Sequence, residues 1–128
     1  MKTVGIGVDI VDNRRFTNLV KDKKFINRTF SKKEILNSKK ISDKINFYSK
    51  RFAAKESFAK ALGTGFRNGL NFKDVEVLNN DLGKPYYLKN IKIKQFIKKI
   101  KKIDNFELFL SISDEKDYSV AFTIIQKI

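Results

Sequence analysis

The side chains best suited to chemistry lie on one predicted helix that runs into a glycine turn. The helix carries Glu56 and Lys60 one turn apart on the same face. Gly63 is the kind of residue that ends a helix in the left-handed conformation, and the turn continues as Thr64 and Gly65. A carboxylate and an ammonium group beside such a turn suggest a site for a metal ion and a phosphate. The spacing alone favours a plainer alternative, an exposed Glu–Lys pair on a surface helix with a glycine cap.

A second candidate carboxylate belongs to a predicted strand over residues 3–11. Apolar residues alternate there with Gly5, Gly7 and Asp9, which therefore share the other face. The two glycines leave space for another backbone or a ligand, and Asp is depleted in strands. Asp9 is thus a candidate site residue, although a strand-end acid that caps the next helix would look the same.

Asp9 and Glu56 together offer two carboxylates on rigid elements, a strand and a helix. Such a pair suits Mg²⁺, whose remaining ligands would be water and the phosphate oxygens of a substrate. Arg51, Lys60 and the amides of residues 63–65 would then bind the remaining phosphate charge. Spacing in the sequence does not establish that the two carboxylates meet.

The composition narrows the chemistry further. The chain of 128 residues contains no Cys and no His, which excludes Cys/His zinc sites, cysteine nucleophiles and histidine bases. Its length predicts a single domain over residues 1–128. It has no apolar run of about 18 residues and no signal-peptide pattern, so we expect a cytoplasmic protein without membrane insertion.

The chain is strongly basic, with 28 Lys and Arg against 14 Asp and Glu. Such a surface attracts polyanions such as nucleic acid, anionic lipid, phosphorylated small molecules or an acidic protein. Only five of the basic residues are Arg, which argues against sequence-specific reading of DNA. The segment Lys89–Lys102 predicts a basic amphipathic helix, and a non-catalytic module that binds RNA or anionic lipid through it is the alternative function. Such helices more often dock an apolar stripe on a sheet and leave their lysines in water.

The remaining pattern predicts the elements that position these residues. Asp12 is expected to cap a helix that extends to about Lys23, and Ser31 with Glu34 forms a capping box for a short helix. The long helix is expected from about residue 43 to 63, and a later helix over 93–100. Further strands are predicted over residues 72–78, 84–88, 106–113 and 118–125. Because strands and helices do not alternate regularly, we expect an α+β fold in which a largely antiparallel sheet packs with one long helix and several shorter ones.

Four motifs occur in an order that resembles a known family. They are GIGVDIV at 5–11, RFAAKE followed by KALGTG within 51–65, NDLGKP at 80–85 and LSIS at 110–113. Together they are similar to the holo-acyl-carrier-protein synthases, the short type of 4′-phosphopantetheinyl transferase. The resemblance covers nearly the whole chain and implies the fold of that family.

The resemblance also implies a reaction. The enzyme would transfer 4′-phosphopantetheine from coenzyme A to a serine of apo-acyl carrier protein, in fatty acid biosynthesis, and release adenosine 3′,5′-bisphosphate. Asp9 and Glu56 match the Mg²⁺ ligands of the family, and the metal would clamp the pyrophosphate. Lys60 matches a lysine at the leaving phosphate, so Glu56 and Lys60 are the expected catalytic residues. Residues that match or adjoin the coenzyme A pocket are Arg51, Lys60, Thr64, Gly65, Lys84, Pro85 and Ser111.

Two protein partners are implied by the same resemblance. The first is the chain itself, which would form a homotrimer with each site at a subunit boundary. The other is acyl carrier protein, a small acidic helical protein that would give the positive charge a purpose. The expected docking residues are Arg14, Arg15, Lys21, Lys24 and Phe25, although any one of these charges could be a solvated surface group.

One position departs from the family pattern. The family commonly has His directly after the Ser-x-Ser segment, and this chain has Asp114. A base for the serine hydroxyl would then be a metal-bound water or Glu56 rather than Asp114. A carboxylate near the pyrophosphate is mildly unfavourable, so the alternative is that Asp114 turns outward into the hairpin turn. The identity of the base stays open at this point.

Overall fold

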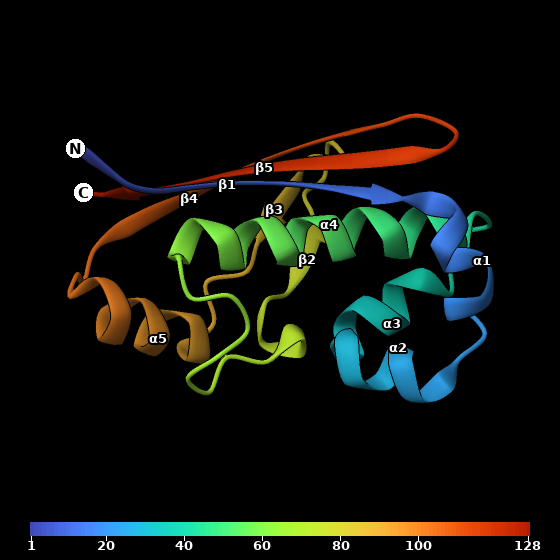
Figure 1. Cartoon of the computed structure of the whole chain (residues 1–128), viewed down its shortest axis with the longest axis horizontal. Helices are drawn as coiled ribbons and strands as arrows, with labels where there is room; N and C mark the ends of the chain where they lie inside the picture. Colours follow the sequence, from blue (N-terminus) through green and yellow to red (C-terminus); the bar gives the residue numbers. More distant parts are fainter.

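Three long strands and one long helix form the centre of the fold (Figure 1). The computed structural model describes residues 1–128. The elements in chain order are β1 (Lys2–Asp12), a 3-10 turn η1 (Asn13–Arg15), α1 (Phe16–Leu19), α2 (Lys23–Thr29), α3 (Lys32–Ser38), α4 (Lys44–Leu62), a 3-10 turn η2 (Phe72–Asp74), β2 (Val77–Asn79), β3 (Pro85–Tyr87), α5 (Ile91–Lys101), β4 (Phe106–Asp114) and β5 (Tyr118–Lys127). Strand β5 lies between β1 and β4 and is antiparallel to both, while β2 and β3 form a separate small hairpin. The predicted α+β fold with a largely antiparallel sheet is confirmed.

Helix α4 lies along one face of the three-stranded sheet, with α1 to α3 at one end and α5 at the other (Figure 1). Its bounds agree with the prediction because both caps form. The Asp43 side chain accepts a hydrogen bond from the Asn46 amide at 3.0 Å, and Gly63 ends the helix at φ 80°. Most of α4 is buried, including Phe58 and Leu62, so the helix forms the centre of the core.

The two glycines of β1 allow α4 to approach the strand closely. A Cβ on Gly7 would lie 1.9 Å from the Ser57 carbonyl oxygen, and one on Gly5 would lie 2.1 Å from that of Ala61. Only glycine fits at either position. The space predicted on this face of the strand is therefore filled by the backbone of α4.

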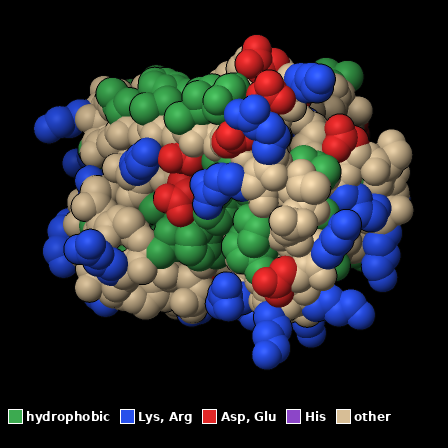
Figure 2. Space-filling view, turned by 45° about the vertical axis from the view of Figure 1, so that its right-hand side comes forward, with side chains coloured by type: hydrophobic (Ala, Val, Ile, Leu, Met, Phe, Trp, Pro, Cys, Tyr) green, Lys and Arg blue, Asp and Glu red, His purple; other side chains and the backbone are tan.

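The apolar face of β1 consequently points away from α4. An alternating strand in an antiparallel sheet ordinarily buries its apolar face, yet Ile6, Val8 and Ile10 are between 52% and 62% exposed. Neighbouring strands add three more exposed side chains to this surface, which are Phe109, Tyr118 and Phe122. Figure 2 shows hydrophobic side chains gathered along the upper edge of the molecule. We call these six residues the outer sheet face.

The helix predicted from Asp12 to about Lys23 is wrong in length. Asp12 caps only η1, and α1 ends at Leu19. A separate helix, α2, begins after Asp22, whose side chain accepts a hydrogen bond from the Phe25 amide at 3.1 Å. Asp22 is a good N-cap residue, and this signal could have revealed the break. The capping box of Ser31 and Glu34 is confirmed at α3.

The second half of the chain largely follows the prediction. The strand expected over residues 72–78 is wrong in its first part, where Phe72–Asp74 forms the turn η2. The β2–β3 hairpin is confirmed, and so is α5, which buries Ile93 and Ile97 and leaves most of its lysines exposed. None of the helices combines the length and hydropathy that crossing a membrane requires.

Candidate functional site

Asp9 and Lys60 meet between β1 and α4. The Lys60 Nζ lies 3.0 Å from the Asp9 Oδ1, and the Asp9 side chain is largely buried while that of Lys60 is more than half exposed. Asp9 follows Gly7 on the strand face that contacts α4, so its carboxylate is directed toward the helix. The close helix–strand approach therefore brings together residues 51 positions apart in the chain.

Glu56 is the third member of this group. Burial and then the negative charge of Asp9 raise the pKa of the half-buried Glu56 carboxyl, while Lys60 and Arg15 oppose that shift. Two carboxylates thus interact in a partly desolvated place, which the sequence could not establish. A cation placed between them would relieve their repulsion.

The donor set at Asp9 and Glu56 fits Mg²⁺. The structure has no group of three or more Asp, Glu, His or Cys side chains able to share one ion. Mg²⁺ is commonly held by only one or two carboxylates, with water and substrate phosphate completing its shell. Two carboxylates with an open exposed side are therefore a suitable site for Mg²⁺ together with a phosphorylated substrate.

The glycine turn after α4 is less available to phosphate than predicted. The amides of Gly63 and Gly65 both donate to the Ala59 carbonyl, which closes the helix end. The Thr64 hydroxyl donates to the Gly65 carbonyl at 2.9 Å. A helix C-terminus also carries partial negative charge. Of the predicted amide donors, those of Gly63 and Gly65 are therefore already used, and the cation in this region is Lys60.

A cavity of about 540 Å³ opens on another side of α4, beside the β2–β3 hairpin. Arg51 and Pro85 line it, and Lys84 is the residue between the lining positions Gly83 and Pro85. The cavity shares no residue with the group of Asp9, Glu56 and Lys60. We call this space the hairpin cavity. Its other lining residues are Asn37, Lys40, Ile41, Asn46, Phe47, Lys50, Val77, Asn79, Ile112 and Asp114.

Arg51 is an unusual side chain in the wall of the hairpin cavity. It is only 7% exposed, stacks with its Cζ 3.6 Å from the centre of the Phe47 ring, and donates from Nη2 to the Asn79 side chain. Its Nε has no hydrogen-bond partner, and no carboxylate forms an ion pair with it. Burial lowers the pKa of the Arg51 guanidinium to about 10. A buried cation without a carboxylate partner favours an anionic ligand in this cavity.

Ser111 lies apart from both groups. It pairs in register with Phe122 and alternates with the buried Leu110, so it is exposed on the side of the sheet that faces away from α4. The residues predicted to bind coenzyme A therefore occupy three places in a single chain. These are the hairpin cavity, the end of α4 with Lys60, Thr64 and Gly65, and the outer side of β4.

The residues predicted to dock a carrier protein gather around η1 and α2. Arg14 forms two 2.8 Å hydrogen bonds to Asp12, whose charge raises the pKa of the Arg14 guanidinium. The charge of Arg15 opposes the rise in the pKa of the Glu56 carboxyl. Lys21 and Lys24 are exposed.

Phe25 borders a second cavity of about 790 Å³, which we call the aromatic cavity. Its wall includes three more phenylalanines that the sequence did not single out, Phe52, Phe66 and Phe72. The rings of Phe66 and Phe72 stack with centres 3.7 Å apart. These residues come from α4 and from the loop that follows it, and no spacing rule connects them to Phe25.

Asp114 faces α4. The Asn46 amide nitrogen donates to its Oδ2 at 2.7 Å, and the carboxylate lines the hairpin cavity. The alternative that Asp114 turns outward is therefore wrong. The side chain is held by a neutral amide, so its negative charge remains in the cavity that contains Arg51.

The comparisons with known proteins show the family of this chain. The family model described as 4′-phosphopantetheinyl transferase superfamily matches residues 5–123. A holo-[acyl-carrier-protein] synthase of Pelagibacter ubique is 60% identical over 127 residues, which cover 99% of both chains. The crystal structure of the Neisseria meningitidis holo-[acyl-carrier-protein] synthase is 35% identical with a TM-score of 0.87, and covers 98% of this chain and 99% of its own. The Bacillus anthracis synthase in complex with CoA is 32% identical with a TM-score of 0.82, with both chains fully covered. The chain therefore belongs to the 4′-phosphopantetheinyl transferase superfamily and is an enzyme of its holo-[acyl-carrier-protein] synthase group.

Proposed function

We propose that the chain transfers 4′-phosphopantetheine from coenzyme A to a serine of apo-acyl carrier protein in a Mg²⁺-dependent reaction that serves fatty acid biosynthesis in the cytoplasm. The observation that carries this proposal is the meeting of Asp9, Glu56 and Lys60 at one open position between β1 and α4. Two carboxylates for a metal and an ammonium group for a phosphate are the parts that phosphoryl transfer needs, since its catalysis is mainly positioning and charge stabilisation.

In the proposed reaction the serine oxygen forms a bond to the phosphorus that carries pantetheine. The bond from this phosphorus to the bridging oxygen breaks, and adenosine 3′,5′-bisphosphate leaves with that oxygen. Asp9 and Glu56 would hold Mg²⁺, which would supply positive charge that favours cleavage of the pyrophosphate. The Lys60 ammonium, which pairs with Asp9 in this structure, would stabilise the leaving phosphate.

The serine proton needs an acceptor, and we assign this role to Glu56 or to a water molecule rather than to Asp114. Burial and then Asp9 raise the pKa of the metal-free Glu56 carboxyl, and a cation held by both carboxylates would oppose that shift. Asp114 lines the hairpin cavity, whose wall includes neither Asp9 nor Lys60. With no histidine in the chain, the base must come from a carboxylate or from water.

We assign Arg51, Lys84 and Pro85 to the nucleotide end of coenzyme A, in the hairpin cavity. The buried guanidinium of Arg51 supports this assignment, because no carboxylate forms an ion pair with it and a phosphate in the cavity would balance its charge. Thr64, Gly65 and Ser111 stay predicted contacts.

A homotrimer with sites at subunit boundaries would bring these separated places together. The outer sheet face supports this proposal, since contiguous exposed apolar surface marks an interaction site. Cyclic association of three copies would bury that face and place residues of one chain beside those of the next.

Acyl carrier protein is the proposed macromolecular partner, and it would dock on η1 and α2. Arg14, Arg15, Lys21 and Lys24 offer positive charge for its acidic surface, and the aromatic cavity beside Phe25 offers an apolar pocket. No observation favours the alternative of a non-catalytic module acting through Lys89–Lys102.

The deciding experiment is the mass of apo-acyl carrier protein after incubation with the protein, coenzyme A and Mg²⁺. We expect a shift equal to one phosphopantetheine group, which is absent when EDTA removes the metal. Asp9→Asn and Glu56→Gln should each lower the rate by roughly a hundredfold or more, because they remove charge that stabilises the transition state. The matched control Asp104→Asn removes an exposed carboxylate that pairs with Lys98 and should leave the rate unchanged. Modification at the wild-type rate by both site variants would refute the proposed site.

A further inference from the structure

A buried ion pair lies on the side of α4 that carries Arg51. Glu34 of α3 and Lys55 of α4 are both completely buried, and the Lys55 Nζ lies 2.8 Å from the Glu34 Oε1. Sequence reasoning placed Glu34 only in a capping box, where it accepts from the Ser31 amide at 2.9 Å. The proposed reaction uses neither side chain.

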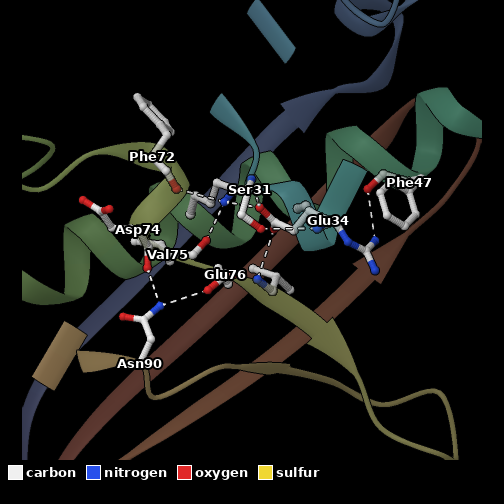
Figure 3. Close-up of polar contacts among 11 residues, drawn as sticks. Ser31, Glu34, Phe47, Phe72, Asp74, Val75, Glu76 and Asn90 are labelled. Carbon is white, nitrogen blue, oxygen red and sulfur yellow. Dashed lines mark hydrogen bonds and ion pairs between the residues drawn. The ribbon is translucent and has the colours of Figure 1, made fainter. Parts of the chain in front are cut away.

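The other bonds of this pair go to one segment of backbone, as Figure 3 shows. The Lys55 ammonium donates to the carbonyl oxygens of Phe72 and Val75. The Glu34 Oε2 accepts from the amide of Val77 at 3.1 Å. Two helices are thus connected to residues 72–77, which lead directly into the β2–β3 hairpin.

Stability is a weak explanation for such a pair. Burial lowers the pKa of the Lys55 ammonium, so the fold bears the cost of removing a charge from water. Replacing a buried ion pair with apolar side chains is often neutral or stabilising. A pair of charges differs from apolar packing in fixing a specific geometry, because each donor and acceptor has a defined direction.

The geometry in question belongs to the hairpin cavity. Val77 and Asn79 of β2 line that cavity, and Asn79 accepts from Arg51. Arg51 and Lys55 are four residues apart and therefore extend from one face of α4. That face of the helix contacts the hairpin region at two points. Lys55 bonds to the segment before β2, and Arg51 bonds to Asn79 at the end of β2.

We propose that Glu34 and Lys55 are positioning residues that hold the β2–β3 hairpin against α4 in the arrangement that coenzyme A binding requires. The pair does not touch the ligand and acts through Val77 and the hairpin. This inference rests on the proposed function for the identity of the ligand, but not for the mechanical connection between the pair and the hairpin.

Two variants separate positioning from stability. Lys55→Met removes the ammonium and leaves Glu34 unpaired, which is expected to destabilise the protein. The double variant Glu34→Gln/Lys55→Met removes both charges and should recover much of that stability, yet the bonds to Phe72 and Val75 remain lost. The matched control is Tyr48→Phe, which deletes a buried 2.8 Å hydrogen bond from Tyr48 to Ser38 between the same two helices and does not touch the hairpin.

Hydrogen exchange and coenzyme A titration give the two readouts. In the double variant we expect the amides of Asn80 and Leu88, which close the hairpin, to exchange roughly tenfold faster relative to β5 amides. The dissociation constant for coenzyme A should rise by about tenfold, comparable to the loss of one charged hydrogen bond. The Tyr48→Phe control should show neither change.

The outcomes are distinguishable. Hairpin exchange in the double variant equal to that of Tyr48→Phe would make the pair a purely structural one, and so would faster exchange with unchanged coenzyme A affinity. If the wild-type protein fails to bind coenzyme A at all, the proposed function is overturned. In that case unchanged hairpin exchange would also overturn the mechanical role of the pair.

Discussion

Glu56 and Lys60 differ from an ordinary surface pair because of what faces them from β1. Lys60 is bonded to Asp9 rather than to Glu56, and Glu56 is left with a neighbouring negative charge and partial burial. A Glu–Lys pair one turn apart usually satisfies itself in water. Here Asp9 of β1 takes Lys60 as its partner, so the Glu56 carboxylate has no ion-pair partner of its own. That missing counter-charge is the residue-level argument for a bound cation.

Replacement of Lys60 tests its assignment to phosphate rather than to the metal. Lys60→Met should lower kcat by about a hundredfold, the effect of losing one preorganised donor to a developing charge. Binding of Mn²⁺, measured by its EPR signal, should stay equal or become tighter, because Asp9 loses a competing cation. Lys98→Met is the matched control, since it removes a lysine that is likewise exposed and 3.0 Å from a single aspartate. Weaker Mn²⁺ binding with normal kcat would contradict the assignment.

Asp114 provides a second test at a single side chain. Its charge lies in the hairpin cavity opposite the phosphates proposed to bind there. Asp114→Asn keeps an oxygen that can accept from Asn46, so the geometry is retained while the charge is lost. We expect coenzyme A to bind roughly threefold more tightly at low salt, with the difference shrinking at high salt as screening increases. Isothermal titration at two salt concentrations measures this, and Glu107→Gln serves as the distant control.

Single residues also show which features of the site local sequence patterns could predict. The types and spacing of Asp9, Glu56 and Lys60 suggested a site, but their meeting depends on a strand and a helix that are separated along the chain. The capping box revealed one oxygen of Glu34, because that bond is local. The bond of the second oxygen requires Val77 to approach α3, and the pairing with Lys55 requires α3 to approach α4. No local pattern encodes either approach.

The backbones of β1 and α4 lie in close contact. Their separation is set by two positions without a side chain, and each lies beside a site residue. Gly7 faces the carbonyl of Ser57, the neighbour of Glu56, and Gly5 faces that of Ala61, the neighbour of Lys60. Ser57 also joins α4 to β5 through hydrogen-bond contact with Thr123. The distance between the carboxylates is therefore a property of this helix–strand contact.

Gly7→Ala should lower both activity and stability. The added methyl group would lie 1.9 Å from the Ser57 carbonyl oxygen, so it would force α4 away from β1 and cost at least the ~1–3 kcal/mol of unfolding free energy typical of overpacking. Activity at a temperature where the variant is folded should fall at least tenfold, and Mn²⁺ should bind more weakly. Gly69→Ala is the control, because it strains a backbone at φ 94° in open space and leaves the helix–strand contact intact. Equal activity in the two variants would refute the argument.

At the same level, predicted elements were reliable where their signals were local. The caps of α4 and the apolar stripe of α5 fixed those helices well. Helix α2 was missed because Asp22, its N-cap, was assigned to the end of the preceding predicted helix. The apolar alternation of β1 identified a strand correctly. Alternation alone does not tell which face of a strand is buried, and here the face with the glycines packs against α4.

At the scale of the whole molecule, a single chain leaves an apolar sheet face exposed and keeps the proposed ligand contacts apart. Six exposed apolar side chains lie on the sheet face opposite α4, and the proposed coenzyme A contacts lie in three separate places. Both observations have one explanation if copies of the chain associate through the outer sheet face. A residue of one copy would then complete the site of its neighbour, and isolated chains would be inactive.

Mixing two inactive variants tests this arrangement directly. Glu56→Gln damages the metal half of the site, and Arg51→Met damages the hairpin cavity. If each site combines these halves from different chains, random reassembly of an equal mixture should restore about a quarter of the wild-type activity, since each intact half occurs with a probability of about one half. A mixture of Glu56→Gln with Asp9→Asn should restore none, because both changes lie in the same half. No recovery in the first mixture, with exchange of subunits verified by native mass spectrometry, would place the complete site within one chain.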